Sequence, residues 1–246
     1  MKHFATACAL LFVLAGFASA QTTKPWTEWS KKEVEKTLND SAWSQTQAEA
    51  PQSQSPSTAA ITSTMAARRE DRSIDAASNN AESGQSKPKA SIKYYVRFLS
   101  AKPIRAAFAR RVLLEQAQPN EELATQLKAF VDRDFSNYIV ITVSVEVGDE
   151  KMVSGVTRAF SAATTEALQQ NVYLERKDGK KLFLMEYRPP AGDGMGAKFV
   201  FKRAEGGQPF LTDNDSVRFF AQLNEKMKVN AKYKLADMLF DGRVEY

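Results

Sequence analysis

The sequence has one cysteine and one histidine among its 246 residues, Cys8 and His3. A basic start, an apolar run to Phe17 and the small residues Ala18-Ser19-Ala20 predict a secretory signal peptide over residues 1–20. Cleavage after Ala20 removes both the cysteine and the histidine. We therefore expect an exported protein, located in the periplasm or outside the cell, whose mature chain contains neither residue type.

The absence of cysteine and histidine excludes several kinds of chemistry from the mature chain. Disulfide bonds cannot form, so the oxidising compartment adds no covalent cross-links. Ser-His-Asp and Cys-His catalysis need an imidazole base, and the common zinc sites need histidine or cysteine ligands. Only metals that prefer oxygen ligands, such as calcium, stay possible. We expect no cofactor, and any enzyme would depend on carboxylates, lysine, tyrosine or a Ser-Lys pair.

The sequence also has no apolar run as long as a membrane span, and its excess of positive over negative charge is small. The apolar part of the signal is shorter than the roughly 20 residues of a membrane-spanning helix, so we expect no transmembrane segment after cleavage. The formal net charge falls from +5 to +4 on cleavage, because Lys2 and no acidic residue is lost. This excess does not predict nucleic-acid binding, and it allows only weak attraction to anionic lipid or polysaccharide.

All three tryptophans lie in residues 21–44, which form one predicted unit. Ser30 and Glu33 have the spacing of a capping box, and they predict a short helix that continues to about residue 43. A helix this short needs a surface to dock on. Two alternatives stay open: the tryptophans dock on their own domain, or they bind an envelope protein or a glycan. The candidate binding residues are Trp26, Trp29 and Trp43.

Residues 45–90 differ in composition from the rest of the chain. Gln, Ser, Ala, Thr, Asn and Pro dominate, and apolar residues show no period. Such a segment buries too little apolar surface to offset the entropy cost of ordering. We therefore predict a disordered linker over 45–90, which joins the tryptophan segment to a domain over 91–246.

The domain over 91–246 combines strand and helix patterns. Predicted strands cover 92–98, 139–147, 172–177, 181–188, 198–203, 217–223 and 229–235, with a last short strand after Asp241-Gly242. Predicted helices cover about 103–116, about 120–131 with Asn120 as N-cap, and 158–170. Short turns such as Asp178-Gly179 imply antiparallel pairing. The predicted fold class is α+β, an antiparallel sheet packed against two or three helices.

Four motifs in the domain suggest chemistry, and each also has a simpler structural interpretation. The glycine-rich residues 192–196 precede a strand, whereas a phosphate loop opens a helix, so they indicate a hairpin loop. Residues 213–215 lack the later Gly and Glu of an EF-hand, so they indicate a turn. The two acids of residues 132–134 do not face each other on a helix end. A solvated basic helix face is predicted for Lys102, Arg105, Arg110 and Arg111.

Five stretches of the mature chain carry a resemblance to a known family. They are residues 26–32 (WTEWSKK), 38–41 (LNDS), 95–103 (YVRFLSAKP), 130–135 (FVDRDF) and 235–246. In them the chain resembles a family of uncharacterised exported proteins from soil bacteria, especially acidobacteria. The resemblance covers most of the mature chain except the linker. It implies no activity and assigns a role to no residue.

Three functional hypotheses follow from these observations. The first is a non-enzymatic binding or assembly module of the cell envelope that acts through its tryptophans. The second is a carrier of an apolar ligand such as lipid, because the predicted strands are rich in phenylalanine: Phe98, Phe183, Phe199, Phe201, Phe219 and Phe220. The third is a carboxylate-based hydrolase, with Asp132, Asp134, Asp213 and Asp215 as the acids that can be named. The oligomeric state is not decided by the sequence.

Overall fold

The computed structural model describes residues 24–49, 92–118, 120–213 and 215–246. The predicted signal peptide and the part of the predicted linker over 50–90 lie outside the described residues. The described chain is an α+β fold of antiparallel sheets and helices, as predicted. None of its described helices is long and apolar enough to cross a membrane.

Two antiparallel sheets enclose the main core. The first has the strand order β1-β2-β3-β7-β6, and the second has the order β11-β10-β4-β5. The first consists of Ser44–Glu49 (β1), Ile92–Phe98 (β2), Tyr138–Val147 (β3), Ala197–Lys202 (β7) and Glu186–Arg188 (β6). The second consists of Lys228–Lys234 (β11), Ser216–Gln222 (β10), Val172–Arg176 (β4) and Lys181–Phe183 (β5). Two small hairpins pair Ala204–Glu205 (β8) with Gln208–Pro209 (β9), and Leu239–Phe240 (β12) with Arg243–Val244 (β13).

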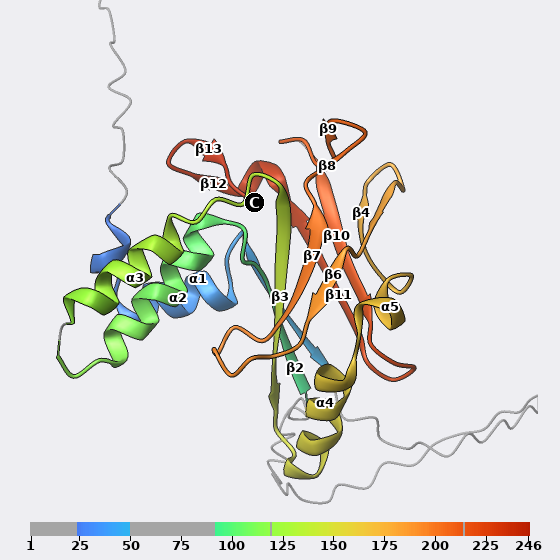
Figure 1. Cartoon of the computed structure of the whole chain (residues 1–246), viewed down its shortest axis with the longest axis horizontal. Helices are drawn as coiled ribbons and strands as arrows, with labels where there is room; N and C mark the ends of the chain where they lie inside the picture. Colours follow the sequence, from blue (N-terminus) through green and yellow to red (C-terminus); the bar gives the residue numbers. More distant parts are fainter. Residues whose placement is uncertain (1–23, 50–91, 119, 214) are drawn as a thin grey trace, which may run out of the picture.

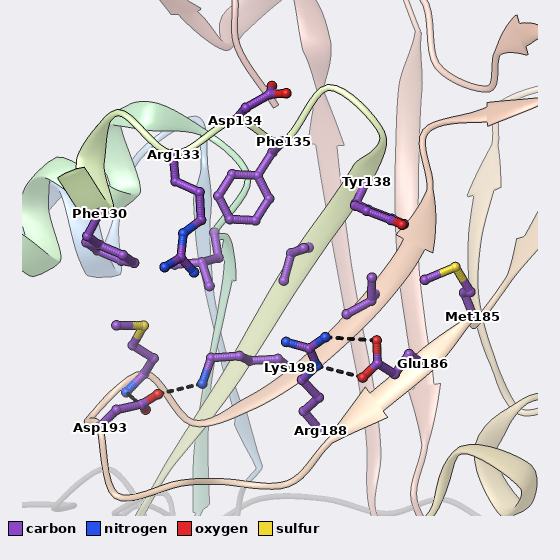
Figure 2. A pocket seen from close by; sticks show the side chains of 14 residues that line it. Phe130, Arg133, Asp134, Phe135, Tyr138, Met185, Glu186, Arg188, Asp193 and Lys198 are labelled. Atoms are coloured by element: carbon purple, nitrogen blue, oxygen red, sulfur yellow. Dashed lines mark hydrogen bonds and ion pairs between the residues drawn. The ribbon is translucent and has the colours of Figure 1, made fainter.

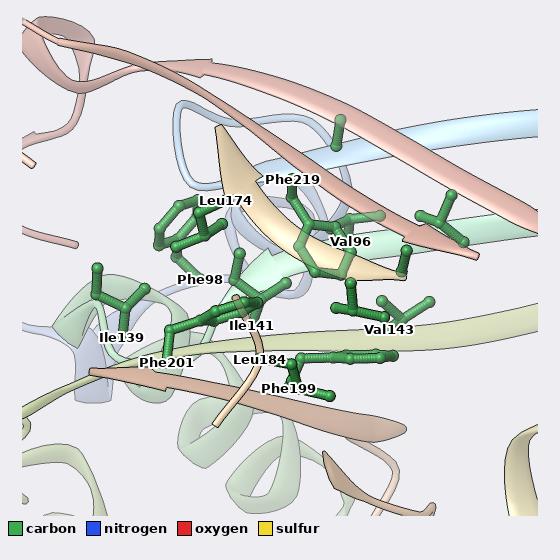
Figure 3. Packing of buried hydrophobic residues seen from close by; sticks show 14 of the residues in the cluster. Val96, Phe98, Ile139, Ile141, Val143, Leu174, Leu184, Phe199, Phe201 and Phe219 are labelled. Carbon is green, nitrogen blue, oxygen red and sulfur yellow. The ribbon is translucent and has the colours of Figure 1, made fainter. Parts of the chain in front are cut away.

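Alternation along the strands places large aromatic rings between the two sheets. Phe199 of β7 and Phe219 of β10 are completely buried. Their rings meet edge to face with 5.4 Å between centroids (Figure 3). Phe98 of β2 packs in the same way on Tyr233 of β11, at 4.8 Å. Edge-to-face pairs of this kind add to the hydrophobic gain of burial, so the space between the sheets is a filled core.

The first strand of the fold lies where a linker was predicted, and that prediction is wrong for residues 45–49. β1 pairs antiparallel with β2, from Ser44 opposite Arg97 to Glu49 opposite Ile92. Only Ser44 of this strand is buried. The polar sequence therefore lacks the apolar face by which a strand is usually predicted, although its backbone groups are paired.

The side chain of Gln47 joins β1 to β11, where the two sheets meet. Its Nε2 donates to the carbonyl oxygen of Lys228 at 2.8 Å, and its Oε1 accepts from the backbone N–H of Asn230 at 2.7 Å. A primary amide carries the same donor and acceptor as a peptide group. The Gln47 side chain therefore makes the two hydrogen bonds with β11 that a backbone residue of a paired strand would make.

Replacing Gln47 with alanine is expected to lower the free energy of unfolding by about 1–2 kcal/mol, because two backbone groups of β11 lose their partner. Urea unfolding measures the change. The control is Gln45→Ala, an exposed residue two positions earlier on β1, which should change stability by less than about 0.5 kcal/mol. Equal effects of the two substitutions would show that the Gln47 bonds do not stabilise the junction.

The predicted single strand over 181–188 is instead two strands in different sheets. β5 pairs with β4 of the second sheet, and β6 pairs with β7 of the first. Between them, Leu184 N–H donates to the carbonyl oxygen of Val172 at 3.0 Å, and Met185 N–H donates to that of Val200 at 2.9 Å. The chain thus passes from one sheet to the other at these two residues. An apolar pattern cannot show such a crossing, because both halves remain extended.

Three helices cover the outer face of the first sheet (Figure 1). They are α1 (Lys31–Asn39), α2 (Lys102–Glu115) and α3 (Glu121–Val131), and a 3-10 turn, η1 (Trp26–Glu28), precedes them. Ile104 and Phe108 of α2 pack on Val140 of β3. The predicted N-cap of α3 is confirmed, since Asn120 Oδ1 accepts from Leu123 N–H at 3.1 Å.

The helix predicted over 158–170 is displaced toward the N-terminus and divided. The structure has α4 (Glu150–Ala162) and α5 (Thr165–Leu168), and a second 3-10 turn, η2 (Leu235–Asp237), lies near the C-terminus. Asp149 caps α4 by accepting from Lys151 N–H at 3.0 Å. Only Val156 and Phe160 of α4 are buried, so its early turns lack the apolar stripe on which the prediction depended.

The predicted capping box of α1 is present, although the helix ends at Asn39 and not near residue 43. Glu33 N–H donates to Ser30 Oγ at 3.3 Å, and Ser30 N–H donates to Glu33 Oε2 at 2.6 Å. Lys24 Nζ lies 3.1 Å from the same carboxylate. The hydrogen bonds from Ser30, followed by the one from Lys24, lower the pKa of Glu33 to about 2.

Ser30→Ala is expected to raise the pKa of Glu33 toward its ordinary value of 4.5, because the largest cause of the shift is the Ser30 side chain. The pKa is lowered in the folded state, so the ionised carboxylate stabilises α1 above pH 4.5. That contribution is lost as the pH falls from 4.5 to about 2. A carboxyl-carbon NMR titration measures the pKa, and an unchanged value in Ser30→Ala would show that the Ser30 hydroxyl does not lower it.

Candidate functional site

The tryptophan segment lies against its own domain. Trp26 and Trp29 are half-buried and pack against the cluster formed by Ala106, Ala109 and Val131. Trp29 Nε1 donates to the carbonyl oxygen of Lys24 at 3.0 Å. The structure therefore shows the first of the two alternatives for these two rings, a contact within the chain. Their binding of an envelope partner or glycan stays a prediction.

Trp43 is tied to the C-terminal part of the chain. Its Nε1 donates to the carbonyl oxygen of Glu245 at 2.7 Å. Its ring makes an edge contact with Phe240, with 6.4 Å between centroids. The backbone N–H of Phe98 donates to the Trp43 carbonyl oxygen at 3.0 Å. Trp43 thus links β1, β2 and the β12–β13 hairpin, and both its polar and its apolar parts have internal partners.

The six phenylalanines of the carrier hypothesis divide between the core and the surface. Four of them are completely buried between the sheets, whereas Phe183 is 43 % exposed and Phe220 is half-buried. The buried four fill the interior that a lipid would occupy: Phe98, Phe199, Phe201 and Phe219.

A cleft of about 460 Å³ opens on the outer face of the first sheet, beside the helices (Figure 2). Its floor is apolar, because Val140 of β3, Val200 of β7 and Leu99 face this side of the sheet. The residues after α3 form one wall, and β6 with the loop to β7 forms the other. The remaining lining residues are Phe130, Arg133, Asp134, Phe135, Tyr138, Met185, Glu186, Arg188, Asp193, Met195 and Lys198.

The buried Arg105 holds the first wall in place. Its Nε donates to the carbonyl oxygen of Val131 at 2.9 Å, and its Nη1 donates to those of Leu99 at 3.2 Å and of Ser100. The guanidinium also lies over the ring of Phe135, 4.7 Å from its centroid. One side chain thus joins α2, the end of α3 and the turn after β2.

The prediction of a solvated basic helix face is therefore wrong for Arg105, which is only 4 % exposed. Burial lowers its pKa to about 10, so the side chain remains a cation at neutral pH. The carbonyl groups at the end of a helix need donors. Arg105 supplies a donor to the carbonyl group of Val131 at the end of α3. The helical pattern of the sequence does not show that this carbonyl group needs a donor from another helix.

The second wall includes the glycine-rich residues 192–196, whose interpretation as a hairpin loop is confirmed. They connect β6 to β7, which pair antiparallel. Asp193 stabilises the loop, since its carboxylate accepts from Met195 N–H at 2.9 Å and from Lys198 Nζ at 2.6 Å. Arg111 Nη2 donates to the carbonyl oxygen of Gly194 at 3.2 Å, so the loop is also connected to α2.

The three carboxylates of the cleft are hydrogen-bonded. Asp134 accepts from the backbone and the hydroxyl of Ser136, both at 2.8 Å, and these bonds lower its pKa. Glu186 accepts two bonds from Arg188, at 2.7 and 3.0 Å, which lower its pKa. Burial raises the pKa of Asp193, but the bonds from Lys198 and Met195 outweigh it, and the net shift is downward. All three groups are ionised at neutral pH.

Arg133 differs from the other two cations of the cleft. Arg188 and Lys198 each bind a carboxylate. Within the described residues, no hydrogen bond or ion pair joins the Arg133 side chain to a neighbour. Figure 2 shows its guanidinium directed into the cleft between the rings of Phe130 and Phe135, while Asp134 points away. The site thus combines an apolar floor with one cation that has no internal partner.

No protein-family model matches the chain, and no curated protein or solved structure does. The properties of the cleft are therefore inferred from its own residues.

The other acids named from the sequence do not line the cleft, and Asp213 among them is exposed. Asp132 binds Lys102 Nζ at 2.8 Å. Asp215 accepts from the backbone N–H of Thr212 at 2.6 Å and from its hydroxyl at 2.9 Å, and its own N–H donates to the Thr212 carbonyl oxygen at 2.9 Å. These bonds are those of a turn, as predicted there, although residue 214 lies outside the described residues. The described residues include no group of three or more acids, histidines or cysteines that could hold a metal ion.

Proposed function

We propose that this protein is an exported, non-catalytic binding module of the cell envelope, and that the cleft over β3, β6 and β7 is its recognition site. The volume of the cleft, about 460 Å³, lies within the range of roughly 300–1,000 Å³ that is common for small-molecule sites. The observation that carries the proposal is that Arg133 points into a cleft whose lining includes the apolar Val140 and Val200.

The state of the carboxylates favours binding over hydrolysis. A hydrolase that depends on two carboxyl groups needs one acid with a raised pKa as proton donor. The cleft acids all have lowered pKa values. Burial raises the pKa of Glu49, but this residue ends β1, receives a hydrogen bond from the Tyr94 hydroxyl at 3.3 Å, and does not line the cleft.

A carrier of an apolar ligand is the alternative. Since Phe98, Phe199, Phe201 and Phe219 fill the space between the sheets, such a ligand would also have to use the cleft. Both proposals therefore predict occupancy of the same site, and they differ in whether the ligand must carry a charge.

A screen of a mixed library of small neutral, cationic and anionic compounds tests the binding function. The readout is NMR of carbon-13-labelled methionine methyl groups, because Met185 and Met195 line the cleft. Met152 on α4 and Met227 in the core serve as internal controls. We expect binding compounds to shift the first two signals and leave the controls unchanged. A screen in which no compound moves Met185 or Met195 would contradict the proposal.

Export has its own test. The full chain, produced in a bacterium with a secretory pathway, should yield a protein whose intact mass corresponds to a chain beginning at Gln21. Recovery from the cell envelope fraction of a protein that still contains residues 1–20 would overturn the cleavage prediction.

A further inference from the structure

We propose that the ligand of the cleft is an organic monoanion, a carboxylate attached to an aromatic or aliphatic body, and that Arg133 binds the carboxylate. This inference rests on the proposed binding function of the cleft. It assigns the charge of the ligand and the residue that recognises that charge.

The internal pairing of the cleft leaves Arg133 as the group that needs a partner. Three cations and three acids line the site. Arg188 and Lys198 are neutralised by Glu186 and Asp193, and Asp134 is hydrogen-bonded to Ser136. A guanidinium presents two parallel N–H donors that match the two oxygens of a carboxylate. The free donor group and the direction of its side chain therefore both favour a carboxylate.

The backbone that carries Arg133 is fixed on both sides. Before it, the carbonyl oxygen of Val131 accepts from Arg105, and Asp132 binds Lys102 at 2.8 Å. After it, the carbonyl oxygen of Phe135 accepts from Arg203 Nε at 3.2 Å. Binding then orders one side chain and not a loop, which lowers the entropy cost of association.

The floor and rim of the cleft determine the body of the ligand. Val140 and Val200 are each 6 % exposed and contribute apolar surface to the lining of the cleft. The half-buried ring of Phe135 stands at one wall, and Met185 and Met195 also line the cleft. Methionine side chains adapt to ligands of different shape. The site therefore suits a compact apolar group joined to the carboxylate.

The balance of charge disfavours a dianion such as a phosphate ester. Arg133 is the one lining cation without an ion pair among the described residues, and the remaining acid, Asp134, points away from the cleft (Figure 2), so a single negative charge on the ligand matches Arg133. A second negative charge would have no cation of its own and would lie near the carboxylates of Glu186 and Asp193. A cationic ligand would meet acids that are already paired.

Titration calorimetry with three probes tests the inference: 4-phenylbutyrate, the neutral 4-phenylbutan-1-ol, and the dianion phenyl phosphate. We expect 4-phenylbutyrate to bind at least about tenfold more tightly than either of the others, because only its carboxylate can accept paired, charge-assisted hydrogen bonds from Arg133 without adding a second negative charge. Arg133→Met should remove this preference, and Arg133→Lys should restore part of it. Arg158→Met, an exposed arginine of α4, is the matched control and should leave affinities unchanged.

The outcomes separate the inference from the function on which it rests. If the alcohol binds as tightly as the carboxylate, or if Arg133→Met keeps the preference, the inference is wrong, and shifts of Met185 and Met195 would still support the binding function. If no probe or library compound moves those two methyl signals, both proposals fail. Arg133→Met should unfold at the same urea concentration as the wild type, because its guanidinium has no internal partner among the described residues.

Discussion

Replacing Arg105 with methionine is expected to lower the free energy of unfolding by about 3 kcal/mol. The side chain is 4 % exposed and donates to the carbonyl oxygens of Val131, Leu99 and Ser100. Methionine has a similar length but no donor, so buried carbonyl groups would lose their partners. The contact with the Phe135 ring would also lose its charge. The helix layer should therefore separate from the sheet more easily.

Urea unfolding of Arg105→Met and Arg133→Met measures this effect with the same chemical change at two sites. Arg133 is exposed, so its substitution should change stability by less than about 0.5 kcal/mol. A loss of stability in Arg105→Met that is no larger than in Arg133→Met would show that Arg105 does not hold the layers together.

Gly196→Ala is expected to lower the free energy of unfolding by about 3 kcal/mol, through backbone strain and a clash. Gly196 has a φ of 89°, a conformation that costs any residue with a Cβ atom. A Cβ at this position would also lie 2.3 Å from the carbonyl oxygen of Val143 on the neighbouring strand β3. The start of β7 would have to move away from β3, and Met195 would move with it.

Gly179→Ala separates the two causes. Gly179 has a φ of 82°, but no atom lies within 4 Å of its ideal Cβ position. An alanine at residue 179 would have the backbone strain of a positive φ without a steric clash, so we expect the free energy of unfolding to fall by about 1 kcal/mol. Only Gly196→Ala should also shift the Met195 methyl signal. Equal losses of stability in the two variants would mean that β7 accommodates a Cβ at residue 196 without resistance.

The sequence predicted those strands that have one face on the core and the other in solvent. In β11, Val229, Ala231 and Tyr233 are buried while Asn230 and Lys232 between them are exposed, and this contrast produces the alternating pattern. The N-cap of α3 was predictable for a similar reason, because Asn120 forms its hydrogen bond within the same short segment. The alternating strand and the helix N-cap were predictable because each depends on residues that are close together in the sequence.

The features that the sequence did not reveal depend on partners far along the chain. β1 is polar, and its place is determined by pairing with β2 and by the Gln47 bonds to β11. The crossing between β5 and β6 depends on hydrogen bonds to Val172 and Val200. Neither arrangement leaves an apolar period in the residues concerned.

The cleft was not predicted, because its walls come from separate parts of the sequence. Arg133 was noted only as the middle residue of an acidic motif on a helix end, and residues 192–196 only as a loop. The fold brings both into the lining of one cleft, together with Val140 and Val200. The one local signal was that the acids of residues 132–134 do not share a face. This spacing leaves Asp132 paired with Lys102 and directs Arg133 into the cleft.

A crystal structure of the protein with 4-phenylbutyrate would show directly whether Arg133 binds the carboxylate in the cleft. We expect the carboxylate oxygens to lie about 2.8 Å from the guanidinium nitrogens of Arg133, with the phenyl ring against Val140 and Val200. The pairs Arg188–Glu186 and Lys198–Asp193 should remain intact. A ligand outside the cleft, or one whose carboxylate displaces Glu186 from Arg188 while Arg133 stays in solvent, would contradict the claim.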